Sequence, residues 1–391
     1  MALNRAWVQN VNRAPEDRPH SAPKLSDRQR LAWLRLIRSE NVGPASFRAL
    51  INRFGTAEAA LHALPELAAR GGAKRLPRVA DENEALRELD EARRLGFRFV
   101  AIGEADYPLI LARTELPPPL LCVAGSASVF ETPMVGIVGA RNASITGIKL
   151  ARKIAAELGE AGYGTVSGLA RGIDAAAHEA ALPFGTIAVM AGGLDQPYPS
   201  ENIPLMEEII EKGGAVITEM PLGWRATARD FPRRNRIVAA LSVGLVVIEA
   251  AKRSGSLISA RLATELGRDV FAVPGSPLDP RSEGSNGLIR NGATLVTSAA
   301  DIVEDLRPQQ TLWSPTAQAE VNEPDHGEYQ PSDVERDRIV EALDYTPVET
   351  DELIRHTGLP ASAVLAHLLE LDLAGRIQRL PGNRVQRLAE E

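Results

Sequence analysis

The middle of the chain alternates between short, continuous apolar runs and longer amphipathic stretches. Continuous apolar strands separated by amphipathic helices are typical of a parallel sheet covered by helices on both faces. We therefore predict a doubly wound α/β domain over residues 97–306, with short additional strands at 97–102 and 119–123. The predicted parallel strands cover 134–139, 163–168, 185–193, 214–219, 244–250, 269–275 and 292–296. The predicted helices cover about 144–161, 172–182, 202–212, 233–242, 256–267 and 299–306.

The segments before this domain have other patterns. Residues 1–24 are polar and without periodicity, so they are predicted to be a disordered leader. Residues 25–96 are helical in pattern and predict a small helical domain. Within it, "NVGPASFRALINRFGT" resembles a helix-hairpin-helix with glycines at Gly43 and Gly55. Amides of such a glycine turn can hold a DNA phosphate, but the pattern also suits a plain packing unit, which we favour.

The C-terminal part contains a predicted linker and a second small domain. Residues 307–331 lack periodicity, contain four prolines and are predicted to be the linker. Residues 332–391 predict three helices and a two-stranded hairpin, a pattern that resembles a winged helix-turn-helix. The recognition helix expected in "SAVLAHLLELDLAG" has no Arg or Lys. This composition favours a docking or auxiliary role over the reading of duplex DNA.

Composition narrows the class of protein. The 391 residues have a formal net charge of −7, so the surface as a whole does not attract polyanions, although a local basic groove remains compatible with this charge. The single cysteine, Cys122, excludes an internal disulfide framework and a Cys-rich zinc site. No apolar run approaches the roughly 18 residues of a membrane span, and the N-terminus does not resemble a signal peptide. We expect a cytoplasmic protein.

Basic residues follow four of the first five predicted parallel strands. In a doubly wound sheet, ligands bind beyond the carboxyl ends of the strands, where helix N-termini attract anions. The dinucleotide fingerprint and the Walker A lysine motif are both absent, so a single bound nucleotide is not indicated. Several arginines on small-residue loops suit a row of phosphates and the stacking of unpaired bases. The residues are Arg141, Arg171, Arg225, Arg229, Arg233, Arg234, Arg236, Lys252 and Arg253.

Seven motifs, in order, resemble those of the DNA-processing protein A family (DprA, also called Smf). They are "IVGARNAS", "VSGLARGIDAAAH", "AGGLDQPYP", "FPRRNRIVAALS", "VVIEA", "RSGSLISARLA" and "VFAVPG". The resemblance implies an extended Rossmann-like domain that binds single-stranded DNA. It also implies a role in natural transformation (competence), where members protect incoming strands and help to load RecA recombinase. Members form homodimers through the central domain and are not known as enzymes, so we expect neither a cofactor, a metal nor a catalytic residue.

The matched motifs also imply which residues line the DNA. Arg233 and Arg236 are three positions apart and are expected on one helical face, with Arg234 pointing elsewhere. Asn235 suits either DNA or a buried backbone group, and the serines near 254 suit either a helix cap or a phosphate. Ala140 stands where the family often has Ser, which removes one hydroxyl. The implied residues are Gly139, Arg141, Ser144, Ser167, Gly168, Arg171, Gly172, Phe231, Arg233, Asn235, Arg236, Ser254, Gly255 and Ser256.

Two other functions are weighed against DNA binding. Asp174 and His178, four residues apart, suggest acid–base chemistry, but a structural role is favoured because no nucleophile or metal partner accompanies them. Nucleotide phosphoribohydrolases share a similar layout, yet "RSGSLISAR" lacks their Gly-Thr and catalytic Glu. A winged-helix transcription regulator is the second rival, and the non-basic recognition helix opposes it.

Overall fold

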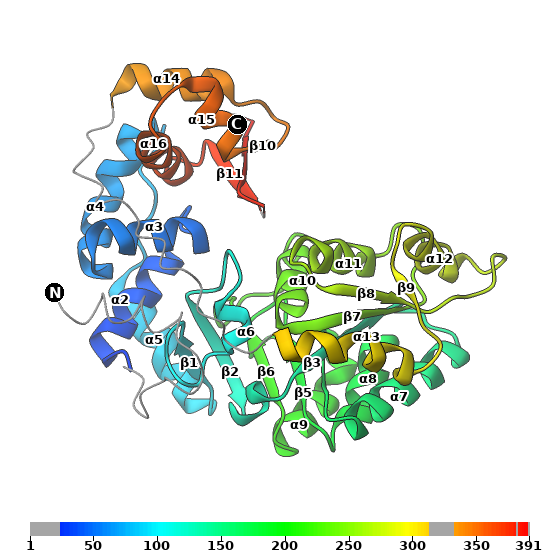
Figure 1. Cartoon of the computed structure of the whole chain (residues 1–391). Helices are drawn as coiled ribbons and strands as arrows, with labels where there is room; N and C mark the ends of the chain where they lie inside the picture. Colours follow the sequence, from blue (N-terminus) through cyan, green and yellow to red (C-terminus); the bar gives the residue numbers. More distant parts are fainter. Residues whose placement is uncertain (1–23, 313–331, 381, 390–391) are drawn as a thin grey trace.

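The computed structural model describes residues 24–312, 332–380 and 382–389. Residues 1–23 of the predicted leader and residues 313–331 of the predicted linker lie outside these ranges. The described chain forms a helical domain, a central sheet domain and a small C-terminal domain that lies beside the helical one (Figure 1). None of the described helices is long and apolar enough to cross a bilayer.

The helical domain consists of α2 (Asp27–Arg38), α3 (Pro44–Phe54), α4 (Ala57–Arg70) and α5 (Glu82–Arg94). Gly43 is the N-cap of α3, and its backbone N–H donates to Ser46 Oγ at 2.9 Å. Gly55 ends α3 in the left-handed conformation, with φ of 74°. The Gly43 amide is thus bonded within the turn.

The central sheet has nine strands in the order β1-β2-β6-β5-β4-β3-β7-β8-β9. The seven strands from β3 onward are parallel, while β1 and β2 pair antiparallel at one edge. The predicted doubly wound α/β fold is confirmed. The strands are β1 (Arg98–Ala101), β2 (Leu120–Gly125), β3 (Met134–Gly139), β4 (Gly164–Ser167), β5 (Thr186–Val189), β6 (Ala215–Thr218), β7 (Ser242–Ile248), β8 (Asp269–Ala272) and β9 (Thr294–Leu295).

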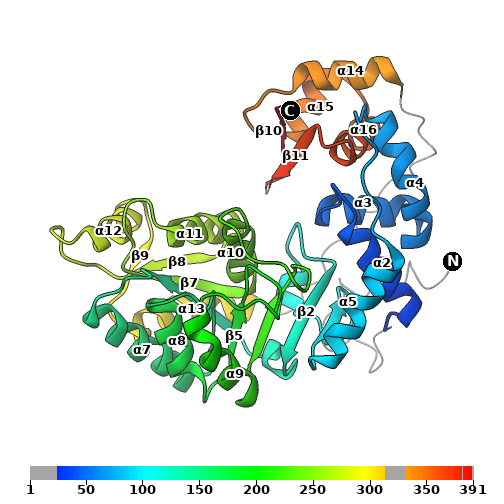
Figure 2. The ribbon, with the colours of Figure 1, turned by 180° about the vertical axis from the view of Figure 1, so that it is seen from behind.

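Helices cover both faces of this sheet (Figure 2). Side chains of β3 alternate between the two cores, so Ile137 packs with α7 and α8 while Val138 packs with α10 and α11. The connection after β3 runs through α7 on one face of the sheet, and the connection after β7 runs through α11 on the other face. The topological switch therefore lies between β3 and β7, which are neighbours in the sheet. The helices are α6 (Leu109–Ala112), α7 (Ile145–Glu160), α8 (Ile173–Ala181), α9 (Ile203–Glu211), α10 (Asp230–Leu241), α11 (Gly255–Glu265), α12 (Glu283–Arg290) and α13 (Ala299–Leu312).

The predicted start of the linker is wrong. Helix α13 continues to Leu312, so residues 307–312 are helical where the linker was expected to begin. The glutamines that follow Pro308 are good helix formers and offset part of the cost of a proline inside a helix.

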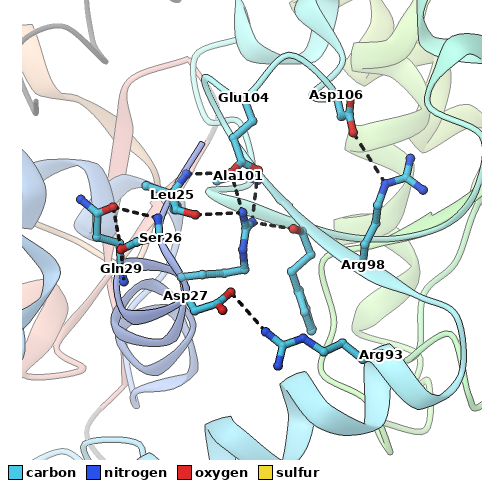
Figure 3. Close-up of polar contacts among 11 residues, drawn as sticks. Leu25, Ser26, Asp27, Gln29, Arg93, Arg98, Ala101, Glu104 and Asp106 are labelled. Atoms are coloured by element: carbon cyan, nitrogen blue, oxygen red, sulfur yellow. Dashed lines mark hydrogen bonds and ion pairs between the residues drawn. The ribbon is translucent and has the colours of Figure 1, made fainter. Parts of the chain in front are cut away.

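Buried polar contacts join the helical domain to edge strand β1. Arg30 of α2 donates to the carbonyl oxygen of Phe99 at 2.6 Å and pairs with Glu104 at the same distance. The Glu104 carboxylate also accepts from the backbone N–H groups of Leu25 and Ala101 (Figure 3). Because both ionised side chains are largely buried, they fix the helical domain against the edge of the sheet.

The C-terminal domain has the winged-helix arrangement predicted from the sequence. Its helices are α14 (Asp333–Ala342), α15 (Thr350–Thr357) and α16 (Ala361–Leu373). A three-stranded sheet follows the order β10-β12-β11, with β10 (Val348–Glu349), β11 (Ile377–Leu380) and β12 (Arg384–Arg387). The wing between β11 and β12 points toward the central domain (Figure 1).

Candidate nucleic-acid interface

The loops that follow β3 and β4 meet at the carboxyl edge of the sheet. Gly172 has a φ of +74°, and a Cβ on it would lie 2.4 Å from the carbonyl oxygen of Ala140. A Cβ on Gly139 would lie 1.9 Å from the carbonyl oxygen of Ile248. These close backbone approaches explain why glycine stands at both positions. They bring the loops that bear Arg141 and Arg171 together at the topological switch.

Phe231, at the start of α10, contacts side chains from two loops. The Arg141 guanidinium carbon lies 4.8 Å from the centre of the Phe231 ring, a cation–π arrangement. The Tyr198 ring meets Phe231 edge to face at 6.1 Å between centroids. Among the described residues, Arg141 is exposed and has no carboxylate partner. Its charge is therefore available to an anion, and a flat group can stack beside it.

Arg233 and Arg236 lie on one face of α10, as expected, but that face meets a carboxylate. Both pair with Glu219, which follows β6 and has a side chain only 6% exposed. Arg236 also donates to the Leu116 carbonyl oxygen at 2.8 Å and is 18% exposed, so it is a structural residue in this arrangement. Arg233 is 45% exposed and keeps part of its surface at the edge. The negative charge of Glu219 reduces the attraction of Arg233 for an anion at the carboxyl edge of the sheet.

Arg234 is buried beneath the glycine loop that follows β4. A Cβ on Gly168 would lie 1.1 Å from Arg234 Nη1, so the loop closes over the guanidinium only because this residue is glycine. The neighbouring Asp174 carboxylate accepts from the Gly168 and Ala170 backbone N–H groups at 3.1 and 3.4 Å. Burial raises the pKa of Asp174, which the positive charge of Arg234 opposes. The pair holds the loop in shape from below.

The N-terminus of α7 is occupied by a carboxylate of the chain itself. Ser144 caps α7, and its backbone N–H donates to Glu249 at 2.8 Å while its hydroxyl donates to the same side chain. Glu249 follows β7 across the switch. A phosphate at this helix end would meet a negative charge, so the predicted contact of Ser144 with DNA has no free donor in this structure.

Most of the remaining predicted polar residues have structural bonds. Ser167 is fully buried and donates to the Ile137 carbonyl oxygen at 2.6 Å. Asn235 donates to the carbonyl oxygen of Gly255 at 3.3 Å, and Ser254 caps α11 through the backbone N–H of Ser256. Arg171 is exposed but pairs with Glu201 at 2.6 Å. Exposed backbone at Gly255 and exposed charge at Arg171 remain at the edge, whereas the serines stabilise it.

His178 is buried and neutral. Thr186 Oγ1 donates to the Thr165 carbonyl oxygen, so His178 Nδ1–H donates to Thr186 Oγ1 at 2.7 Å. Burial lowers the pKa of His178 to about 3, and Arg234 contributes in the same direction. An imidazole that stays neutral across physiological pH, enclosed within the fold, has the structural role favoured from the sequence.

This burial predicts an acid-dependent loss of stability. Below pH 6.5 the unfolded chain protonates His178 while the folded chain does not, so stability falls as the pH decreases. Between about pH 7 and pH 5, urea unfolding should show the parent losing about 2 kcal/mol more than His178→Gln, which has no such group. Equal losses in both proteins would show that His178 titrates normally.

Sequence reasoning missed exposed aromatics and partner carboxylates at this edge. Tyr198 and Trp224 are 54% and 44% exposed, and Trp224 Nε1 donates to Asp230 at 3.0 Å. Both residues lie in turns that follow predicted parallel strands. Glu219 and Glu249 directly follow β6 and β7, in "VITE" and "VVIE". These two partner carboxylates could have been found from the sequence by counting the acidic residues of each turn together with its arginines.

Comparison with known proteins settles the family. Residues 98–307 match the DNA recombination-mediator protein A family over more than half of the chain. The chain belongs to this family. Residues 27–91 match the DprA-like N-terminal HHH domain, and residues 323–383 match the DprA winged helix domain. The resemblance drawn from the seven motifs is confirmed.

Relatives of this family align over most of their length. Protein Smf of Escherichia coli is 39% identical over 287 residues, which cover 71% of this chain and 74% of that protein. Protein Smf of Synechocystis is 32% identical over 93% of this chain and 100% of the relative. The crystal structure of DprA from Streptococcus pneumoniae is 34% identical, with a TM-score of 0.61 over 72% of this chain and 99% of that one. A DprA structure from Helicobacter pylori, described for its single-stranded DNA binding mode, is 29% identical, with a TM-score of 0.50 over 55% and 96%.

Proposed function

We propose that this protein binds single-stranded DNA at the carboxyl edge of its central sheet and acts as a recombination mediator. The observation that carries the proposal is the exposed Arg141 guanidinium over Phe231, at the topological switch where a doubly wound fold binds ligands. Family membership supports the DNA-processing role, and the binding mode described for the Helicobacter pylori protein supports the choice of single strands.

The shape of the edge favours unpaired bases. Phe231 and Tyr198 present aromatic rings around the exposed Arg141 guanidinium, and Trp224 is 44% exposed in the loop after β6. Bases stack on such groups without sequence preference, but only when their faces are not covered by a duplex. A phosphate beside Arg141 and a base on a neighbouring ring would together hold a single strand along the edge.

The recombination role follows from what the family is named for. A mediator that coats incoming single strands protects them during natural transformation and delivers them to a recombinase such as RecA. We include this loading step, a homodimer formed through the central domain, and a cytoplasmic location in the proposal. Light scattering of the purified chain tests the dimer, and RecA filament formation on strands precoated by this protein tests loading.

We further propose that the protein acts by binding and not by catalysis. Asp174 and His178 support this, since both are buried in the scaffold of the glycine loop. A phosphoribohydrolase would release ribose 5-phosphate from nucleotides, and no release is expected here. A transcription regulator would shift a duplex more strongly than a single strand in a gel, which is the opposite of our expectation.

Fluorescence anisotropy with an oligothymidine and a mixed-sequence duplex of equal length tests the function directly. The full chain should bind the single strand about tenfold or more tightly, because only unpaired bases can stack on the edge. Affinity for the single strand should fall with salt, with a slope of about −0.7 for each phosphate neutralised. Equal or tighter binding of the duplex would contradict the proposed function.

A further inference from the structure

Helix α16, which would be the recognition helix of the winged domain, is buried against the helical domain. One face of α16, with Val364, Leu368 and Leu371, belongs to the core of its own domain. Leu369 and Leu373 instead join the apolar core of the helical domain and are almost fully buried. Figures 1 and 2 both show α16 beside α3 and α4. The C-terminal half of α16 is therefore covered by the helical domain, while Leu365 near its start is 43% exposed.

A glycine permits this close contact. A Cβ on Gly71 would lie 2.0 Å from the backbone oxygen of Glu370 and 3.0 Å from the Ala374 side chain. The φ of Gly71 is −67°, which any residue can adopt. The nearest atoms that a Cβ would meet all belong to the winged domain. Glycine is needed here for space between two domains and not for backbone conformation.

Polar bonds surround this apolar contact. The Glu370 side chain is 1% exposed and pairs with Arg70 at 3.0 Å. Asn41, in the turn before α3, donates to the Leu373 carbonyl oxygen at 3.0 Å. Arg336 donates to the carbonyl oxygen of Arg70. A buried carboxylate is favourable only while its charge partner stays in place, so these contacts specify one docked position.

The tip of the wing also binds the chain's own surface. The backbone N–H groups of Gly382 and Asn383 donate to the two carboxylate oxygens of Glu115 at 3.0 and 2.9 Å. Arg384 pairs with Glu265 of α11 at 3.5 Å. Glu115 precedes β2 and Glu265 ends α11, so both carboxylates belong to the central domain. Negative groups thus lie where a wing would meet the phosphates of a duplex.

We propose that the winged domain is an intramolecular clamp whose binding partners are the helical and central domains of the same chain. The docking face of α16 holds the helical domain, and the wing tip holds the rim of the central domain. On this account duplex DNA is not the ligand of this domain, because the C-terminal half of α16 and the tip of the wing are both held by the chain itself. The inference does not depend on the proposed single-strand site, which lies on the carboxyl edge of the sheet.

Hydrogen exchange of the full chain tests the clamp. Gly71→Ala should force the domains apart, with amides of α16 exchanging about tenfold faster and a larger radius of gyration in solution scattering. Gly43→Ala is the matched control, since its φ is −99° and its added Cβ meets nothing within 4 Å. Unchanged exchange in α10 shows that the central domain remains folded. Parent-like exchange of α16 in a folded Gly71→Ala protein would overturn the proposal.

Two further results complete the test. Glu115 is exposed, so Glu115→Ala leaves folding intact and should speed the exchange of the Gly382 and Asn383 amides alone. Adding a short duplex to the parent should leave exchange in α16 and the wing unchanged. Protection or release of these amides by the duplex would identify the winged domain as a duplex reader and contradict the clamp.

Discussion

Replacing Arg141 with alanine is expected to weaken single-strand binding by about tenfold to a hundredfold. The substitution removes a phosphate partner and the group that stacks on Phe231, and aromatic or guanidinium stacking is worth about 1–3 kcal/mol per base. The dependence of affinity on salt should also become shallower by about 0.7 in the logarithmic slope. Anisotropy titrations at several salt concentrations measure both quantities in one series.

Two companion variants separate charge from stacking. Arg141→Lys keeps the charge but loses the planar guanidinium, so it should retain the salt slope and lose part of the affinity. Arg152→Ala is the matched control, because Arg152 is an exposed arginine in α7 that pairs with Glu179 away from the edge. If Arg141→Ala binds like Arg152→Ala, then Arg141 does not contact DNA.

Glu219→Ala should cause the largest loss of stability among the edge variants. It removes a carboxylate that is 6% exposed and leaves Arg236 buried without its charge partner. Removing one member of a buried ion pair typically costs about 3–5 kcal/mol. Arg233 is 45% exposed, so water screens its interaction with Glu219. We therefore expect the free energy of unfolding, measured in urea, to fall by about 3 kcal/mol.

A comparison with an exposed pair tests the physical reason. Glu201 pairs with Arg171 at a similar distance, but both side chains are at least half exposed. Glu201→Ala should therefore change stability by less than about 1 kcal/mol. Similar losses for Glu219→Ala and Glu201→Ala would mean that the Glu219 cluster is not the buried structural pair described here.

The sheet was predictable because its strands are buried on both faces. Runs such as "MVGIVG" and "GLVVI" leave no polar positions for solvent, which indicates a parallel sheet between helix layers. The convergence of the loops bearing Arg141 and Arg171 followed from topology alone, since parallel strands end at one edge. Gly172 then permits the two loops to touch. The motif includes this glycine, but the spacing of the motif does not show which backbone atoms it approaches.

The pairing of individual charges was not predictable in the same way. Arg233 and Arg236 were rightly placed on one helical face, but which carboxylate they meet depends on where the β6 loop returns. The packing of α16 against the helical domain was not predictable for a related reason. An apolar helix with Leu369 and Leu373 on a second face looks like an ordinary core helix until a partner domain is seen against it.

Photo-crosslinking tests the central claim most directly. The full chain would be irradiated with an oligonucleotide containing iododeoxyuridine, whose bases crosslink to the aromatic groups on which they stack, and the adducts located by peptide mass spectrometry. The account predicts adducts at Phe231, Tyr198 or Trp224, on the carboxyl edge of the sheet. Adducts confined to α16 or to the turn at Asn41–Gly43 would contradict it.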